Sequence, residues 1–133
     1  MPESGLVTLP SAHDFDTTLA RLVAALEAKG ITIFASIDHA AGAASVGLLL
    51  RPTTVVVFGN PVAGTPLMQA GQMAGIDLPQ KALVWQDADG TVNLTYNDPS
   101  WVVMRHAIGG TVAPVVAALT AGLEVLARHA TSA

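Results

Sequence analysis

The chain has 133 residues, which fits a single domain over residues 1–133 that folds without a disulfide or a metal. It contains no cysteine, which excludes thiolate metal sites, iron–sulfur clusters and cysteine nucleophiles. The net charge is −4 and the six Lys and Arg residues are scattered, so the sequence argues against nucleic acid as a partner.

Charged residues make up only 12% of the chain, against about 25% in an average globular domain. So few charges leave a monomer with apolar surface, which predicts that a second copy covers part of it in a homodimer. Aromatic residues are 5%, too few for a surface that stacks bases. The N-terminal segment lacks the basic and apolar stretches of a signal peptide, so we expect a cytoplasmic location.

The first elements are predicted to be a strand, a helix and a strand. Residues 6–9 form a short strand, and Asp14 then caps a helix that Gly30 ends. One helix face carries apolar residues at helical spacing: Leu19, Leu22, Val23 and Leu26. Alternation over residues 31–37 predicts the second strand.

Asp38 and His39 follow this strand and are candidate catalytic residues. The alternative is that Asp38 caps an alanine-rich helix or turn over residues 39–45, with His39 on the surface. Asn60 and Tyr96 also stand near strand ends, and these ends would form one polar cluster if they converged. Residues 46–50 either extend the turn or begin a strand.

Residues 53–58 are almost all β-branched and predict a central strand buried on both faces. Gly59, Gly64 and Thr65 then have the spacing of a phosphate-binding loop, but the Lys that such a loop requires is missing. We interpret the segment as a strand-to-helix connection, in which Thr65 caps the helix and Pro66 is its first residue. A ligand-binding loop after the strand remains the alternative.

Asp89-Gly90 predicts a hairpin with a two-residue loop. In that register Trp85 faces Leu94 and Leu83 faces Tyr96, so all four side chains share one face of the sheet. The same register places Lys81 opposite Asp98.

Asp98 and Pro99 predict the start of a helix that stops at Gly109-Gly110. A last helix, over about 112–129, carries an apolar stripe of Val115, Leu119, Leu123 and Leu126. Residues 107–123 carry no charge, and the length of this stretch is the lower limit for a membrane span. The internal glycines and Pro114, however, favour a buried or interfacial helix. We therefore predict no membrane association.

The order of elements predicts an α+β fold. The predicted fold is a two-layer sandwich, with an antiparallel or mixed sheet of about four to six strands and helices packed on one face.

Four segments together identify a resemblance: DHAAGA (38–43), FGNPVAGTPLMQ (58–69), IDLPQKALVWQDADG (76–90) and YNDPSWVVMRH (96–106). Over about residues 6–108 the chain resembles the domain-of-unknown-function family 302. The resemblance implies a small α+β domain that assembles as a dimer, and it supplies no catalytic residues.

The leading functional hypothesis is a homodimeric domain that binds a small, partly apolar ligand or a protein partner. Its pocket would be lined by Asn60, Thr65, Trp85 and Tyr96. The alternatives are an enzyme that uses Asp38 or His39 as general acid or base, and a purely structural module.

The four histidines are far apart and lack metal-binding spacing, so we predict no metal and no cofactor. Met68, Met73 and Met104 are expected to fill gaps in the core.

Overall fold

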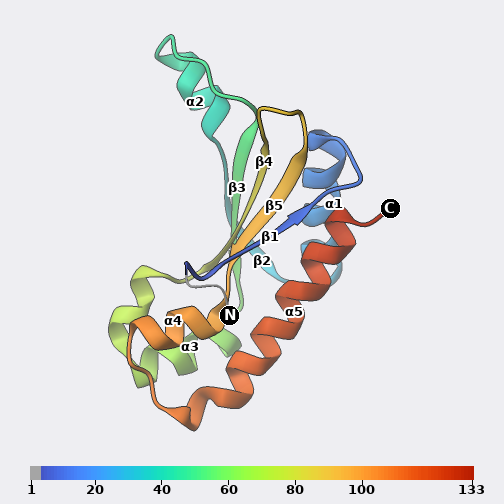
Figure 1. Ribbon diagram of the computed structural model, residues 1–133. Helices are drawn as coiled ribbons and strands as arrows, with labels where there is room; N and C mark the ends of the chain where they lie inside the picture. Colours follow the sequence, from blue (N-terminus) through green and yellow to red (C-terminus); the bar gives the residue numbers. More distant parts are fainter. Residues whose placement is uncertain (1–3) are drawn as a thin grey trace.

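The computed structural model describes residues 4–133, so the first three residues of the predicted domain lie outside the described residues. One antiparallel sheet has the strand order β1-β5-β4-β3-β2 (Figure 1). The strands are β1 (Leu6–Pro10), β2 (Thr32–Asp38), β3 (Thr53–Gly59), β4 (Gln80–Gln86) and β5 (Val92–Asn97). The α-helices are α1 (Phe15–Ala28), α2 (His39–Ser45), α3 (Pro61–Ala70), α4 (Pro99–Arg105) and α5 (Ala113–Thr131), with short 3-10 helices η1 (Gln72–Ile76) and η2 (Gly110–Val112).

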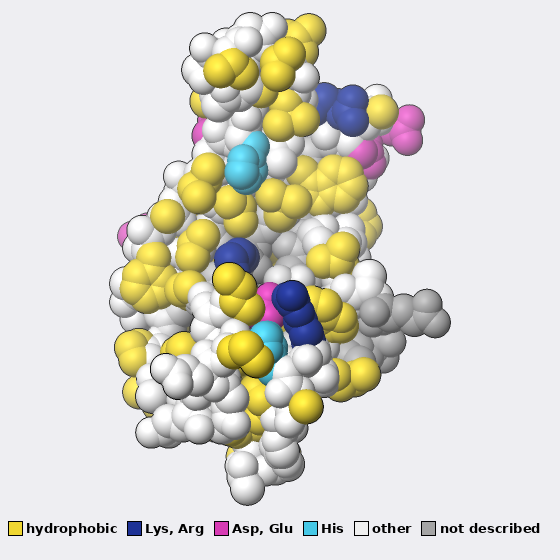
Figure 2. Space-filling model, turned by 90° about the vertical axis from the view of Figure 1, so that its left-hand side faces the viewer, with side chains coloured by type: hydrophobic (Ala, Val, Ile, Leu, Met, Phe, Trp, Pro, Cys, Tyr) yellow, Lys and Arg dark blue, Asp and Glu magenta, His cyan; other side chains and the backbone are white. Residues whose placement is uncertain are grey.

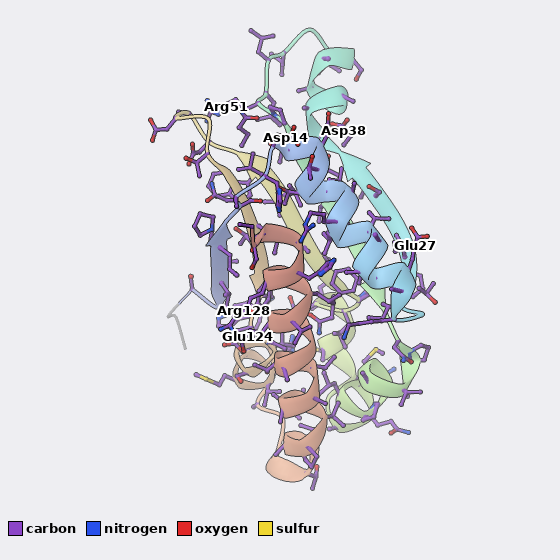
Figure 3. All side chains as sticks on the ribbon, turned by 90° about the vertical axis from the view of Figure 1, so that its right-hand side faces the viewer. Asp14, Glu27, Asp38, Arg51, Glu124 and Arg128 are labelled. Carbon is purple, nitrogen blue, oxygen red and sulfur yellow. The ribbon has the colours of Figure 1, made fainter. Side chains whose placement is uncertain are left out.

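Helices α1 and α5 lie side by side over one face of the sheet (Figure 3). Their buried side chains include Leu22, Leu26, Leu123 and Leu126, which join Val56 and Val84 of the sheet in one core. Helices α3 and α4 gather at one end of the sheet, and α2 projects beyond the other end (Figure 1). This arrangement confirms the predicted α+β fold with helices on one face.

The predicted helix caps Asp14 and Asp98 are confirmed. The Asp14 carboxylate accepts a hydrogen bond from the Thr17 amide at 2.8 Å, and Asp98 accepts one from Ser100 at 2.8 Å. Gly30 ends α1 with a φ of +67°, the left-handed conformation typical of a C′ glycine.

Helix α3 begins five residues earlier than predicted. Asn60, not Thr65, is its cap, because the Asn60 side-chain oxygen accepts from the Val62 amide at 3.0 Å and Pro61 is the first helical residue. Pro66 therefore lies inside the helix. Because Gly64 and Thr65 are helical, they belong to no phosphate-binding loop.

The predicted hairpin register is wrong by one residue. The Asp87 amide donates to the Thr91 carbonyl at 2.9 Å, and Gly90 has a φ of +85°, so the loop is Ala88-Asp89-Gly90 with a bulge. Trp85 consequently pairs with Asn93. A one-residue shift moves every side chain of a strand to the other face.

The same shift removes the predicted contact between Lys81 and Asp98. The Lys81 ammonium instead donates to the backbone oxygens of Asp77 and Pro79, at 3.3 and 3.2 Å.

Three further expectations are corrected. β3 is buried on one face and half-buried on the other, because only the first is covered by helices. α4 ends at Arg105, ahead of the predicted glycines. Met73 and Met104 are exposed, at 80% and 66%, and so do not fill the core.

Residues 46–50 form neither helix nor strand but an exposed loop. We call residues 39–50, helix α2 with this loop, the arm. Its loop exposes large apolar side chains: Val46 (70%), Leu48 (64%), Leu49 (101%) and Leu50 (49%).

The face of the sheet opposite α1 and α5 is not covered by any of the described helices (Figure 2). We call it the open face. It is formed by alternate residues of β2 to β5, which include Ile37, Val55, Leu83, Trp85 and Thr95. In Figure 2 hydrophobic side chains extend from the arm across the middle of this face.

Candidate functional site

The strand-end residues do not form one polar cluster. Asp38 pairs with Thr54 near the start of β3, whereas Asn60 follows the end of β3. At about 3.4 Å per residue, the two positions lie about 20 Å apart along the sheet. Because the strands are antiparallel, the C-terminal ends of neighbouring strands lie at opposite ends of the sheet.

Asp38 caps the alanine-rich helix and His39 lies on the surface, as in the alternative to a catalytic role. The Asp38 carboxylate accepts from the Ala41 amide at 2.9 Å and so caps α2. His39 is exposed and borders a shallow depression on the open face together with Lys81 and Leu83.

Trp85 and Tyr96 belong to opposite faces of the sheet. Trp85 lies on the open face, where its indole N–H donates to the Thr95 hydroxyl at 2.9 Å. Tyr96 pairs with Ala82, belongs to the core and is 7% exposed. Burial raises the pKa of the Tyr96 phenol, and the nearby Glu124 and Asp98 carboxylates raise it further.

Asn60 and Thr65, the other two predicted ligand residues, do border a cavity. It has a volume of about 210 Å³ and lies between the start of α3, the Leu78-Pro79 segment and Leu119 of α5. A second cavity of about 210 Å³ adjoins it towards α1. The two share lining residues: Gly59, Asn60, Ala63, Gln80 and Leu119. We call the pair the α3 cavity.

Gln80 is the buried polar residue of the α3 cavity. It is the first residue of β4, pairs with Phe58 and is only 9% exposed. Its side-chain amide makes no hydrogen bond to any other residue within 4–133. Because no buried side-chain nitrogen or oxygen within residues 4–133 lacks a partner, the unpaired Gln80 amide is accessible from the cavity and offers a donor and an acceptor to whatever occupies it.

A polar cluster that sequence reasoning missed joins η1 to α4. The His106 ring bonds to the Asp77 carboxylate at 2.5 Å, and the Arg105 guanidinium lies 2.9 Å from the same carboxylate. Arg105 also lies over the Trp101 ring, 5.5 Å from its centroid. Asp77 and His106 are 29 positions apart, so no local motif could have revealed the pair.

In residues 4–133 no group of three His, Cys, Asp or Glu side chains is arranged to hold a metal ion.

Helix α5 is the element with a membrane-like composition. Residues Gly110–Thr131 have a mean hydropathy of 1.7 over their most apolar window, and 22% of that window is buried. By length and composition alone the segment could cross a bilayer. Its C-terminal half, however, supplies Leu123, Leu126 and Ala127 to the core.

These features define an α+β domain with a single open antiparallel sheet, one uncovered face and a largely apolar cavity under α3. The chain belongs to the family described as Domain of unknown function DUF302, whose model matches residues 7–126. A crystal structure of an uncharacterised DUF302 protein from Bacillus stearothermophilus has the same fold, with a TM-score of 0.83 and 18% identity. The match covers 95% of this chain and 98% of that one.

Curated proteins of Brucella are also similar. Two of them, from Brucella suis biovar 1 (strain 1330) and Brucella abortus biovar 1 (strain 9-941), are each named fluoride-specific ion channel FluC 1. Each is 41% identical over 128 residues, which is 96% of this chain but 50% and 47% of the respective relative. The chain thus spans about half the length of these relatives.

Proposed function

We propose that the chain is a homodimeric binding domain in which a second copy covers the arm and the open face. The observation that carries this proposal is the apolar loop of the arm, above all Leu49, whose side chain is 101% exposed. Exposed apolar side chains that continue from a projecting loop onto a sheet face are typical of an interaction surface.

The arm favours a second copy of the chain over a charged partner. Between Asp38 and Arg51 the sequence contains no Asp, Glu, Lys or Arg. In a two-fold dimer the same patch meets itself, and an uncharged patch can do so without like-charge repulsion.

Single substitutions test which surface the dimer uses. Leu49→Lys would bury a lysine at the interface of each copy, and we expect it to weaken dimerisation at least about tenfold. The free subunit keeps its stability, because the Leu49 side chain contacts solvent alone. Sedimentation velocity over a dilution series measures the change.

Val125→Lys is the matched control, since Val125 is 53% exposed on α5, away from the arm. We expect this variant to dimerise like the unmodified chain. A dimer that survives Leu49→Lys but is lost in Val125→Lys would refute the arm as the interface.

We further propose that the α3 cavity binds a small, partly apolar ligand. The support is its composition: apolar walls from Phe34, Met68 and Leu78, with amides from Asn60 and Gln80. Small-molecule sites combine a mainly apolar lining with a few polar groups in this way.

Thermal unfolding in the presence of a metabolite library tests the ligand proposal. A ligand of the native state raises the melting temperature by mass action. If no compound of the library raises the melting temperature at saturating concentration, the proposal is contradicted.

The enzyme hypothesis gains no comparable support. Asp38 uses its carboxylate to cap α2, and the strand-end residue Asn60, which could have formed a polar cluster with it, lies at the other end of β3. The purely structural module would be the remaining reading if neither the cavity nor the arm binds anything.

The names of the Brucella relatives favour a second role, that of a domain carried by a longer membrane protein. The supporting observation is that the chain matches only about half of each relative at 41% identity. We propose that this chain has an accessory role in such a protein and does not itself conduct fluoride, because the relatives named as fluoride channels are about twice its length. If so, fluoride efflux from vesicles that contain this chain alone should equal that from empty vesicles.

A further inference from the structure

We infer that Gln80 is the recognition group of the α3 cavity, and that its ligand is a neutral molecule with an apolar body and one carboxamide or lactam group. This inference rests on the proposed ligand-binding role and adds the chemical class of the ligand.

The Gln80 amide is a polar group of the cavity wall that has both functions free. Residue Gln80 is 9% exposed and lines both cavities, while its amide stays accessible from them and has no hydrogen-bond partner in residues 4–133. A free amide presents one acceptor and two donors side by side. A ligand carboxamide satisfies both functions at once, whereas an ether, a ketone or a hydrocarbon leaves at least one of them unpaired.

The start of α3 beside the cavity offers no site for an anion. Helix starts attract anions through free amides, but the first amides of α3 are already used. Val62 donates to the Asn60 side chain at 3.0 Å, and Ala63 and Gly64 donate to the Asn60 carbonyl, each at 3.0 Å.

Among the lining residues the charged side chain is Lys29, which is exposed and lines only the cavity towards α1. The position beside Gln80 therefore suits a neutral group.

The size and walls of the cavity fit a ligand with one ring. A cavity of about 150 Å³ can already hold benzene, so one of about 210 Å³ has room for one ring with a small substituent. One wall is Phe34, at which the pairing of β2 with β3 shifts register between Ile33 and Ala35. Such a bulge re-aims a side chain, and bulges occur often beside binding sites.

Three probes of one ring size test the inference: benzamide, toluene and benzoate. Each is titrated into the isotope-labelled chain, and the Gln80 side-chain amide is followed by NMR. We expect benzamide to shift the Gln80 amide signals saturably and to bind at least tenfold more tightly than toluene or benzoate.

Gln80→Leu removes the amide and keeps an apolar side chain of similar size. We expect it to abolish the preference for benzamide over toluene. Gln86→Leu, at the other end of β4 and outside the cavity, should leave that preference unchanged. If Gln80→Leu does not fold, the response of the Gln80 amide in the unmodified chain decides the matter.

The outcomes separate this inference from the broader proposal. Equal binding of benzamide and toluene, or tightest binding of benzoate, overturns the assignment of Gln80 and leaves a cavity that binds ligands. No effect of any probe on the cavity residues overturns the inference together with the ligand-binding role of the cavity.

Discussion

At the scale of single residues, Tyr96 shows how packing on the helix-covered face changes side-chain chemistry. It is the one tyrosine of the chain and is 7% exposed. Burial disfavours the phenolate, and the carboxylates of Glu124 and Asp98 disfavour it further, so the pKa is raised from its usual value near 10.

The raised Tyr96 pKa predicts a loss of stability in alkaline solution. Below pH 10 the phenol is protonated in both states and has no effect. Above it the unfolded chain loses the proton first, so the folded state binds more protons and the free energy of unfolding falls until the folded pKa is passed.

Urea unfolding from pH 8 upward measures this fall, and phenolate absorbance reports the titration of Tyr96 alone. Tyr96→Phe should be less sensitive to alkaline pH than the unmodified chain. An equal loss of stability in both proteins would show that Tyr96 titrates normally.

The bond between His106 and Asp77 predicts a difference between neighbouring substitutions. The side chains of His106 and Asp77 are 8% and 13% exposed, so His106→Ala should cost about 1–3 kcal/mol of unfolding free energy. The Arg105 side chain is 50% exposed, and Arg105→Ala should cost less, about 1 kcal/mol or below.

Met104→Ala, at an exposed neighbour on α4, is the control for this pair and should change stability by about 0.5 kcal/mol or less. Urea unfolding of the three variants makes the comparison. A greater cost for Arg105→Ala than for His106→Ala would contradict the view that the buried bond joins η1 to α4.

Which residues could be predicted depends on how local their interactions are. Asp14, Asp38 and Asp98 cap helices through bonds that span two or three residues, and such bonds leave a sequence signal. Gln80 carries no comparable signal. Its environment is made by α3, by α5 and by residues of β2 and β3, which are distant in sequence.

At the scale of elements, the sequence predicts the β4–β5 hairpin but not its register. Ala82, Leu83, Val84 and Trp85 are all apolar, so either set of alternate residues could face the core. The loop settled the choice through Gly90, whose left-handed backbone suits a three-residue loop. Trp85 thereby moved to the open face and left the predicted pocket.

The sequence predicts the start of α3 at Thr65-Pro66, but an earlier dipeptide has the same pattern. Asn60-Pro61 and Thr65-Pro66 both have the pattern of a cap followed by proline, and the chain uses the earlier one. The sequence therefore located the helix but not its first turn, which forms part of the cavity wall.

Helix α5 carries a prediction about membranes. Insertion would remove Leu123, Leu126 and Ala127 from the core and expose Leu22 and Leu26 of α1. That cost disfavours insertion. In a flotation assay with neutral phosphatidylcholine vesicles, we therefore expect the purified chain to remain in the dense bottom fraction. Flotation of the folded chain with the vesicles would mean that α5 enters the bilayer.

At the scale of the whole molecule, composition predicted an excess of apolar surface but not its location. With charged residues at 12%, some of the exterior had to be apolar. The location depended on a non-local fact: α1 and α5 both pack on the same face of the sheet, which leaves the other face open (Figures 2 and 3). The arm extends that apolar surface beyond the sheet.

The mass of the unmodified chain in solution tests the central claim most directly. A single chain has a mass of 13.6 kDa, and two chains have 2 × 13.6 = 27.2 kDa. Light scattering at micromolar concentration should give the larger value if a second copy covers the arm and the open face. A mass near 13.6 kDa at that concentration would contradict the account.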